Sequence, residues 1–125
     1  MRMNPALLVA FLSLASVSSY AHHSDVAYET TSIELKEVAF VKTAWVNPHC
    51  IVTFDVKDAS GKATQWIVEM GSPSAMNSVG WNRNSLPPGA VATVDVYPAR
   101  NGTPHGRLAR VRFPDGRTLN YREVR

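Results

Sequence analysis

Cysteine is nearly absent from this chain, because Cys50 is the only one among 125 residues. A single cysteine excludes an internal disulfide and any Cys-x-x-Cys redox or zinc pair. The excess of one charge sign is also small, since 13 basic residues and 10 acidic ones leave a net charge of only +3. This balance gives no strong attraction to nucleic acid or to a membrane surface, and we expect neither as a partner.

The chain also lacks an apolar run long enough to span a bilayer, which takes about 20 residues. Its apolar run at residues 6–17 follows the positive charge of Arg2 and precedes small residues that end at Ala21. This is the pattern of a cleaved signal peptide and is too short for a retained anchor. We expect removal of residues 1–21, a cut after Ala21, and a periplasmic or secreted mature chain that is not inserted in a membrane.

The motifs of several enzyme classes are missing as well. The sequence contains no phosphate-binding loop and no dinucleotide fingerprint. The segment at residues 71–75, GSPSA, lacks the second glycine of a nucleophile elbow, so we interpret Ser72 as a helix cap. The acidic residues are scattered and suggest no catalytic pair. We therefore expect a binding role in preference to an enzymatic one.

What is present is mainly a series of strands. The patterns predict strands at residues 33–46 (with an internal bend), 50–56, 64–70, 91–97, 108–113 and 118–121. Between the third and fourth strands, Ser72 and Pro73 begin a short helix that Gly80 can close. A helix at this place is typical of the five-stranded Greek-key OB barrel.

The predicted fold class is thus mainly β: a small OB-like barrel of five to six strands with one short helix between strands 3 and 4. We assign it to residues 33–125, behind an N-terminal arm at residues 22–32. A simple β-sandwich is the alternative, and the position of the helix counts against it.

Cleavage after Ala21 would make His22 the N-terminal residue, followed by His23. A free α-amino group titrates near about 7.7, so a metal can displace its proton at neutral pH. The amine and Nδ1 of His22 can chelate one ion, and a further imidazole would complete a planar set of three nitrogens that suits Cu(II). This arrangement resembles the histidine brace of lytic polysaccharide monooxygenases and of some periplasmic copper carriers.

Three residues compete to supply the further imidazole. His49 is the first choice, because it lies at the turn between the first two predicted strands, a loop that OB barrels use for ligands. His23 is adjacent, but neighbouring side chains in an extended arm point apart. His105 lies in a predicted loop rich in glycine and proline. A cut one residue earlier would instead place His23 third, where a histidine chelates Cu(II) with backbone amides. The alternatives without metal are a polar tail and a turn histidine bonded to backbone.

Five motifs occur in order along the chain: AHHS at residues 21–24, WVNPH at 45–49, EMGSP at 69–73, GW at 80–81 and SLPPG at 85–89. Together they resemble a family of small exported bacterial proteins classed only as a domain of unknown function. The resemblance implies export, a compact β fold and no established activity. That family usually has a glycine early in its first strand, where this chain has Lys36-Glu37-Val38.

Three functions are compatible with these features. The first is a periplasmic copper-binding domain that uses His22 with His49 or His23. The second is a non-catalytic module for a small ligand, peptide, glycan or periplasmic partner protein, bound near Trp45, Asn47 and Trp81, whose tryptophans flank turns and are expected to be partly exposed. The third, a copper oxidase acting on glycans, is disfavoured because the chain is short for an extended flat substrate surface.

Overall fold

The computed structural model describes residues 26–125, which form six strands and one helix. In chain order the elements are β1 (Ile33–Ala44), β2 (Ile51–Lys57), β3 (Ala63–Glu69), α1 (Pro73–Ser78), β4 (Val91–Pro98), β5 (His105–Arg112) and β6 (Thr118–Asn120). In this part of the chain, no helix has the length and apolar character needed to cross a membrane.

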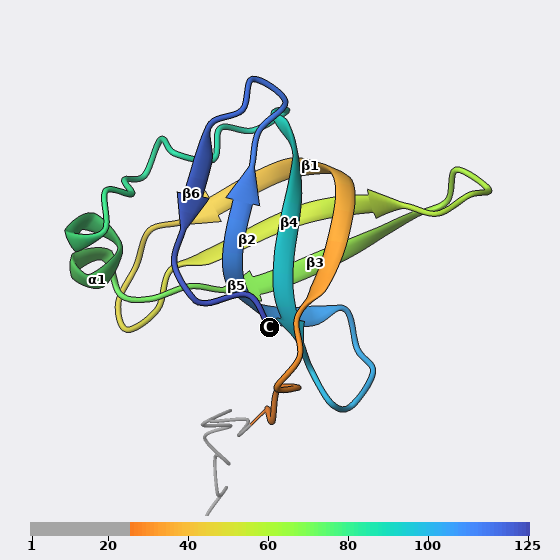
Figure 1. Cartoon of the computed structure of the whole chain (residues 1–125), viewed down its shortest axis with the longest axis horizontal. Helices are drawn as coiled ribbons and strands as arrows, with labels where there is room; N and C mark the ends of the chain where they lie inside the picture. The colour runs from red at the N-terminus through yellow and green to blue at the C-terminus, as the bar shows by residue number, and fades with distance from the viewer. Residues whose placement is uncertain (1–25) are drawn as a thin grey trace, which may run out of the picture.

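The strands form one sheet that closes on itself. Their order is β3-β2-β1-β4-β5-β6, and β3 also pairs with β5 (Figure 1). That additional pairing is parallel and closes five strands into a barrel, with β6 added outside on β5. This strand order, with the helix between β3 and β4, is that of an OB-type barrel. The predicted fold class is confirmed.

The long strand β1 serves both halves of the barrel because it bends. Its pairing with β4 shifts register between Leu35 and Val38, and its pairing with β2 shifts between Phe40 and Lys42. Glu37, inside the first shift, adopts a left-handed φ of 52°. Such bulges increase strand bending and twist. The predicted bend is confirmed, and Glu37 lies within it.

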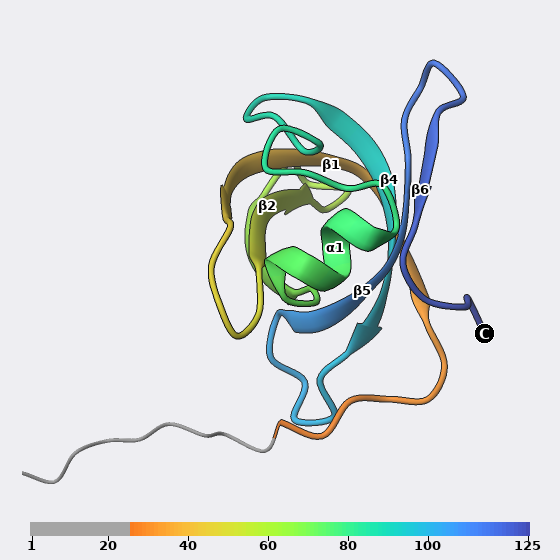
Figure 2. The ribbon, with the colours of Figure 1, turned by 90° about the vertical axis from the view of Figure 1, so that its left-hand side faces the viewer.

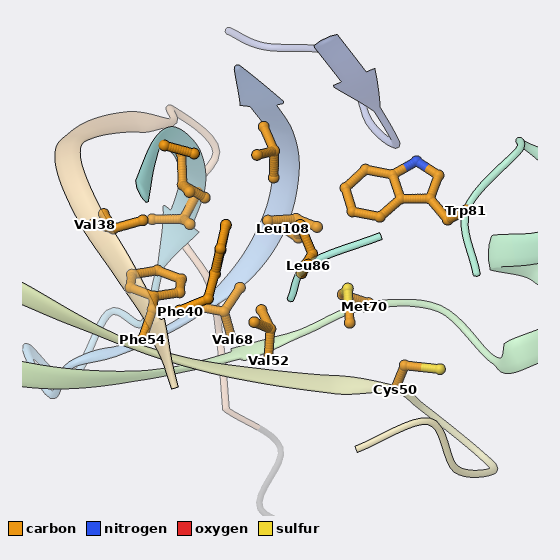
Figure 3. Packing of buried hydrophobic residues seen from close by; sticks show 14 of the residues in the cluster. Val38, Phe40, Cys50, Val52, Phe54, Val68, Met70, Trp81, Leu86 and Leu108 are labelled. Carbon is orange, nitrogen blue, oxygen red and sulfur yellow. The ribbon is translucent and has the colours of Figure 1, made fainter. Parts of the chain in front are cut away.

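The barrel interior is filled by side chains from alternating strand positions, as the sequence pattern predicts (Figure 3). The buried cluster contains Val38, Phe40, Cys50, Val52, Phe54, Val68, Met70, Met76, Trp81, Leu86, Ala92, Val94, Val96, Leu108, Val111 and Phe113. α1 covers one end of the barrel (Figure 2). Its N-cap is Ser72, whose side chain accepts a hydrogen bond from the Ala75 amide at 3.1 Å, as expected.

Trp81 belongs to this interior. It is only 1% exposed, and its indole N–H donates to the Asn120 carbonyl at 3.1 Å. The expectation that Trp81 is partly exposed is therefore wrong. The chain turns back after α1, with the Trp81 amide bonded to the Met76 carbonyl at 3.0 Å, and the side chain packs into the core.

β5 begins earlier than the predicted strand at residues 108–113. His105, placed in a loop by the sequence analysis, is its first residue. β5 begins earlier because it pairs in parallel with β3, and in this pairing, called the β3–β5 seam below, Ile67 pairs with His105 and Glu69 with Arg107. Local hydrophobic alternation does not reveal a pairing partner so distant in sequence.

The described part of the N-terminal arm lies against the turn between β4 and β5 (Figure 2). Tyr28 forms an isolated bridge with Ala99, and the Glu29 amide donates to the Pro98 carbonyl at 2.8 Å. The Arg100 amide donates to the Ala27 carbonyl at 2.9 Å. Backbone hydrogen bonds therefore fix where the arm meets the barrel.

Candidate functional site

An open cleft of about 770 Å³ lies where β3 meets β5, and its volume is typical of small-ligand sites. Its floor is the outer face of paired strands, on which Glu69 has Ile51 as its neighbour on β2 and Arg107 on β5. Residues 46–49 of the β1–β2 loop form one side of the cleft, and residues 26–28 of the arm also line it. The cleft thus combines a barrel face with the loop predicted to bind ligands.

His49 lies in this cleft because the next residue anchors the loop. Cys50 exchanges backbone hydrogen bonds of 2.8 Å with Gly71 and Met70, and its side chain is fully buried. Successive side chains of an extended chain point in opposite directions. His49 is therefore about half exposed, and its Nδ1 lies 3.1 Å from Oε1 of Glu69.

Glu69 is the centre of a polar cluster. The Tyr28 hydroxyl donates to its Oε2 at 3.4 Å, and a guanidinium nitrogen of Arg107 lies 3.9 Å from its Oε1. The same guanidinium lies over the Tyr28 ring, 4.7 Å from its centroid. Burial, and next the negative charge of Glu69, raises the pKa of Tyr28. Tyr28 therefore stays a protonated phenol that can donate.

His105 lines the same cleft from the start of β5. Its Nδ1 lies 3.1 Å from the hydroxyl oxygen of Thr103. That oxygen lies 2.7 Å from Oδ1 of Asn101, which also accepts a hydrogen bond from the Thr103 amide at 3.1 Å. The turn before β5 therefore holds the His105 ring through two polar side chains.

The walls of the cleft are largely apolar. Val46, Ile51 and Ile67 are large hydrophobic residues that are at least 37% exposed, and all three line it. Pro48 adds a further apolar surface. A few polar groups on an apolar lining are typical of pockets that orient a ligand.

The structure brings together only some of the residues that the sequence analysis selected. His49 and Asn47 line the cleft, and so does His105. Trp45 is partly buried against the core, and Trp81 is buried within it, away from the lining. His22 and His23 lie outside the described residues.

Sequence reasoning missed Glu69, Arg107 and Tyr28. Glu69 does lie in the EMGSP motif, so its motif was noticed while its role was not. Arg107 and Tyr28 had no local signal, because they reach the cleft only through the β3–β5 seam and the docking of the arm.

Residues 26–125 contain no group of three or more His, Cys, Asp or Glu side chains placed to hold a metal ion. Cys50 points into the core, where burial raises the pKa of its thiol and so disfavours the thiolate that binds metals. The cleft offers imidazoles, and any metal there needs further ligands from elsewhere.

A model of a family of unknown function matches residues 10–109. No curated protein and no solved structure matches the chain. The resemblance noted from the motifs is thereby confirmed, without an activity attached to it.

Proposed function

We propose that this chain, which belongs to the family of unknown function DUF6152, is an exported domain that binds copper through a processed N-terminal histidine. Signal peptidase would cut after Ala21. The amine and Nδ1 of His22 would then chelate Cu(II), and His49 would supply the third nitrogen.

The observation that carries this proposal is the position of residue 26. Val26 lines the same cleft as His49. Four residue steps separate His22 from Val26, and an extended chain covers at most about 3.3–3.6 Å per residue, or about 14 Å in all. An ion held by His22 is therefore within reach of the cleft and its imidazoles.

The cleft also has the chemistry that a shared copper ion needs. It presents His49 and His105, while the described residues offer no complete ligand set of their own. Two imidazoles without a third strong ligand make a weak site, and a chelating N-terminus would remedy this. Nitrogen ligands in a planar arrangement favour Cu(II) over the other common divalent metals.

The first experiment tests the N-terminus itself. Mass spectrometry of the exported protein should give a chain that begins at His22. Titration with Cu(II) should then show that this chain binds copper more tightly than the same chain with one extra N-terminal Met. The difference in affinity should exceed about 10–100-fold, which is the loss that follows removal of an outer-shell partner of a metal ligand. Equal affinities would reject the proposal.

The second experiment identifies the further imidazole. His49→Ala should weaken Cu(II) binding strongly, whereas His23→Ala, a matched loss of one imidazole beside the amine, should change it little. The reverse result would make His23 the ligand. If neither substitution has an effect, His105→Ala tests the other imidazole of the cleft. No effect of any of the three would reject a shared site at the cleft.

A second candidate function is a non-catalytic binding module for a small ligand or peptide. The exposed apolar residues Val46, Ile51 and Ile67, gathered around one cleft, favour it. Ile67→Ala removes apolar surface without adding a charge or a metal ligand beside the imidazoles. It should then weaken ligand binding and leave Cu(II) affinity unchanged. An NMR screen of small-molecule and peptide libraries measures ligand binding through chemical-shift changes at these three residues.

A further inference from the structure

We propose that hydrogen bonds in and beside the cleft hold His49 and His105 in the same neutral tautomer, with the proton on Nδ1 and a free lone pair on Nε2 for a metal. The tautomers follow from the described residues alone. Their use in binding copper rests on the proposed function.

For His49 the deciding group is Glu69. An ionised carboxylate can only accept hydrogen bonds, and its Oε1 lies 3.1 Å from Nδ1. The Arg107 guanidinium, which can only donate, lies 3.9 Å from the same oxygen. The neutral ring must therefore carry its proton on Nδ1, which leaves Nε2 unprotonated.

For His105 the assignment follows from a chain of three groups. The backbone N–H of Thr103 can only donate, so the Asn101 atom 3.1 Å away is the amide oxygen. That oxygen has no proton, so the Thr103 hydroxyl, 2.7 Å away, donates its single proton to it. The hydroxyl then offers only lone pairs to Nδ1 of His105, at 3.1 Å. Nδ1 must carry the proton.

The two assignments are independent of each other. His49 lies in the β1–β2 loop and His105 begins β5, and their hydrogen-bond partners share no atom. Partners of this kind orient metal-binding imidazoles and raise their basicity. Glu69 and Thr103 are thus positioning residues, and both rings offer Nε2, whereas His22 would bind through Nδ1.

The test is an NMR experiment on the mature, ¹⁵N-labelled chain without metal, at about pH 8, where an ordinary imidazole is neutral. Two-bond ¹H–¹⁵N correlations should show an unprotonated Nε2 and a protonated Nδ1 in both rings. Glu69→Ala should shift His49 toward the other tautomer and leave His105 unchanged. Thr103→Val should do the opposite. In each variant the unaffected ring is the control for folding.

Conservative variants separate a hydrogen-bonding role from a merely structural one. Glu69→Gln should keep the His49 tautomer, because Arg107 can only donate and so holds the amide oxygen on the side that faces Nδ1. Thr103→Ser should keep the His105 tautomer. A proton on Nε2 of either ring in the native chain, or a Glu69→Ala or Thr103→Val variant that leaves its own ring unchanged, would overturn the proposal.

Titration with Cu(II) alone tests the use of these tautomers. Glu69→Ala should weaken binding by about 10–100-fold, because its partner His49 is the proposed ligand. Thr103→Val should change binding little, because its partner His105 is not. A native chain that shows both tautomers but binds no copper would reject the proposed function and leave the tautomers standing. A Glu69→Ala variant that binds copper as tightly as the native chain would overturn the assignment of Glu69 as a positioning residue for the metal.

Discussion

The cleft where β3 pairs with β5 and the barrel interior under α1 differ in exposure and chemistry, although the consecutive residues His49 and Cys50 belong one to each. His49 is about half exposed and contacts a carboxylate, whereas Cys50 is fully buried among apolar side chains. The same division recurs on β3, where Ile67 and Glu69 face the cleft and Val68 faces the core. Residues that face the cleft and residues that pack in the core therefore alternate along the backbone.

Because residues that bind and residues that pack alternate, we expect substitutions to affect stability or binding, residue by residue, but not both. The interior gains its free energy from burial of apolar surface, and the cleft contributes little to it because its groups remain in contact with water. Substitutions on the two sides of one backbone segment should therefore have effects of different kinds.

The largest effect is expected in the interior. Trp81→Ala removes a large buried ring and its hydrogen bond to Asn120, and should lower the free energy of unfolding by about 3–5 kcal/mol. Urea denaturation measures this. Trp45→Ala is the matched control, since Trp45 is only partly buried and should cost less. Equal losses at both positions would remove the distinction between core and periphery.

The neighbours His49 and Cys50 should differ in which property their substitution changes. Cys50→Ser places a hydroxyl in apolar surroundings and should cost about 1–3 kcal/mol of stability without changing Cu(II) affinity. His49→Ala should change stability by no more than about 0.5 kcal/mol while weakening Cu(II) binding. Denaturation and titration of both variants check this, and a substitution that changes both quantities would contradict the division.

A smaller effect depends on pH. Burial raises the pKa of the Cys50 thiol, so above the ordinary thiol pKa the unfolded chain binds fewer protons than the folded one. Stability from this group is complete below the ordinary pKa and falls as pH rises toward the raised value, by at most about 1.4 kcal/mol per pH unit. Denaturation of the native chain and of Cys50→Val across this alkaline range should show a steeper decline for the native chain. Parallel curves would exclude this linkage.

The smallest expected effect is at the bend of β1. Glu37 has a φ of 52°, which a glycine adopts without steric cost. Glu37→Gly should raise stability by about 0.5 kcal/mol, because relief of the left-handed strain exceeds the greater freedom of glycine in the unfolded chain. Lys36→Gly, which removes a side chain without such strain, should lower stability. Thermal denaturation of both variants compares them, and destabilisation by Glu37→Gly would show that the bend is not strained.

Most of the fold could be predicted because its signals are local. Alternation over residues 50–56 located β2, and the Ser72–Pro73 pair located the start of α1. Only part of the site could be predicted. His49 and Asn47 carried a signal in the turn motif, but Glu69 could not be distinguished from other acidic residues on strands.

The sequence by itself determined the strand pattern, the helix cap, the single buried cysteine and the leader-like segment before a pair of histidines. Only the tertiary structure decided that Glu69, His105 and Arg107 lie beside His49 and that Trp81 lies in the core. The physical reason is the closure of the barrel. The parallel β3–β5 pairing joins segments that are distant in the chain, and no local periodicity encodes which distant strand will supply the missing hydrogen bonds.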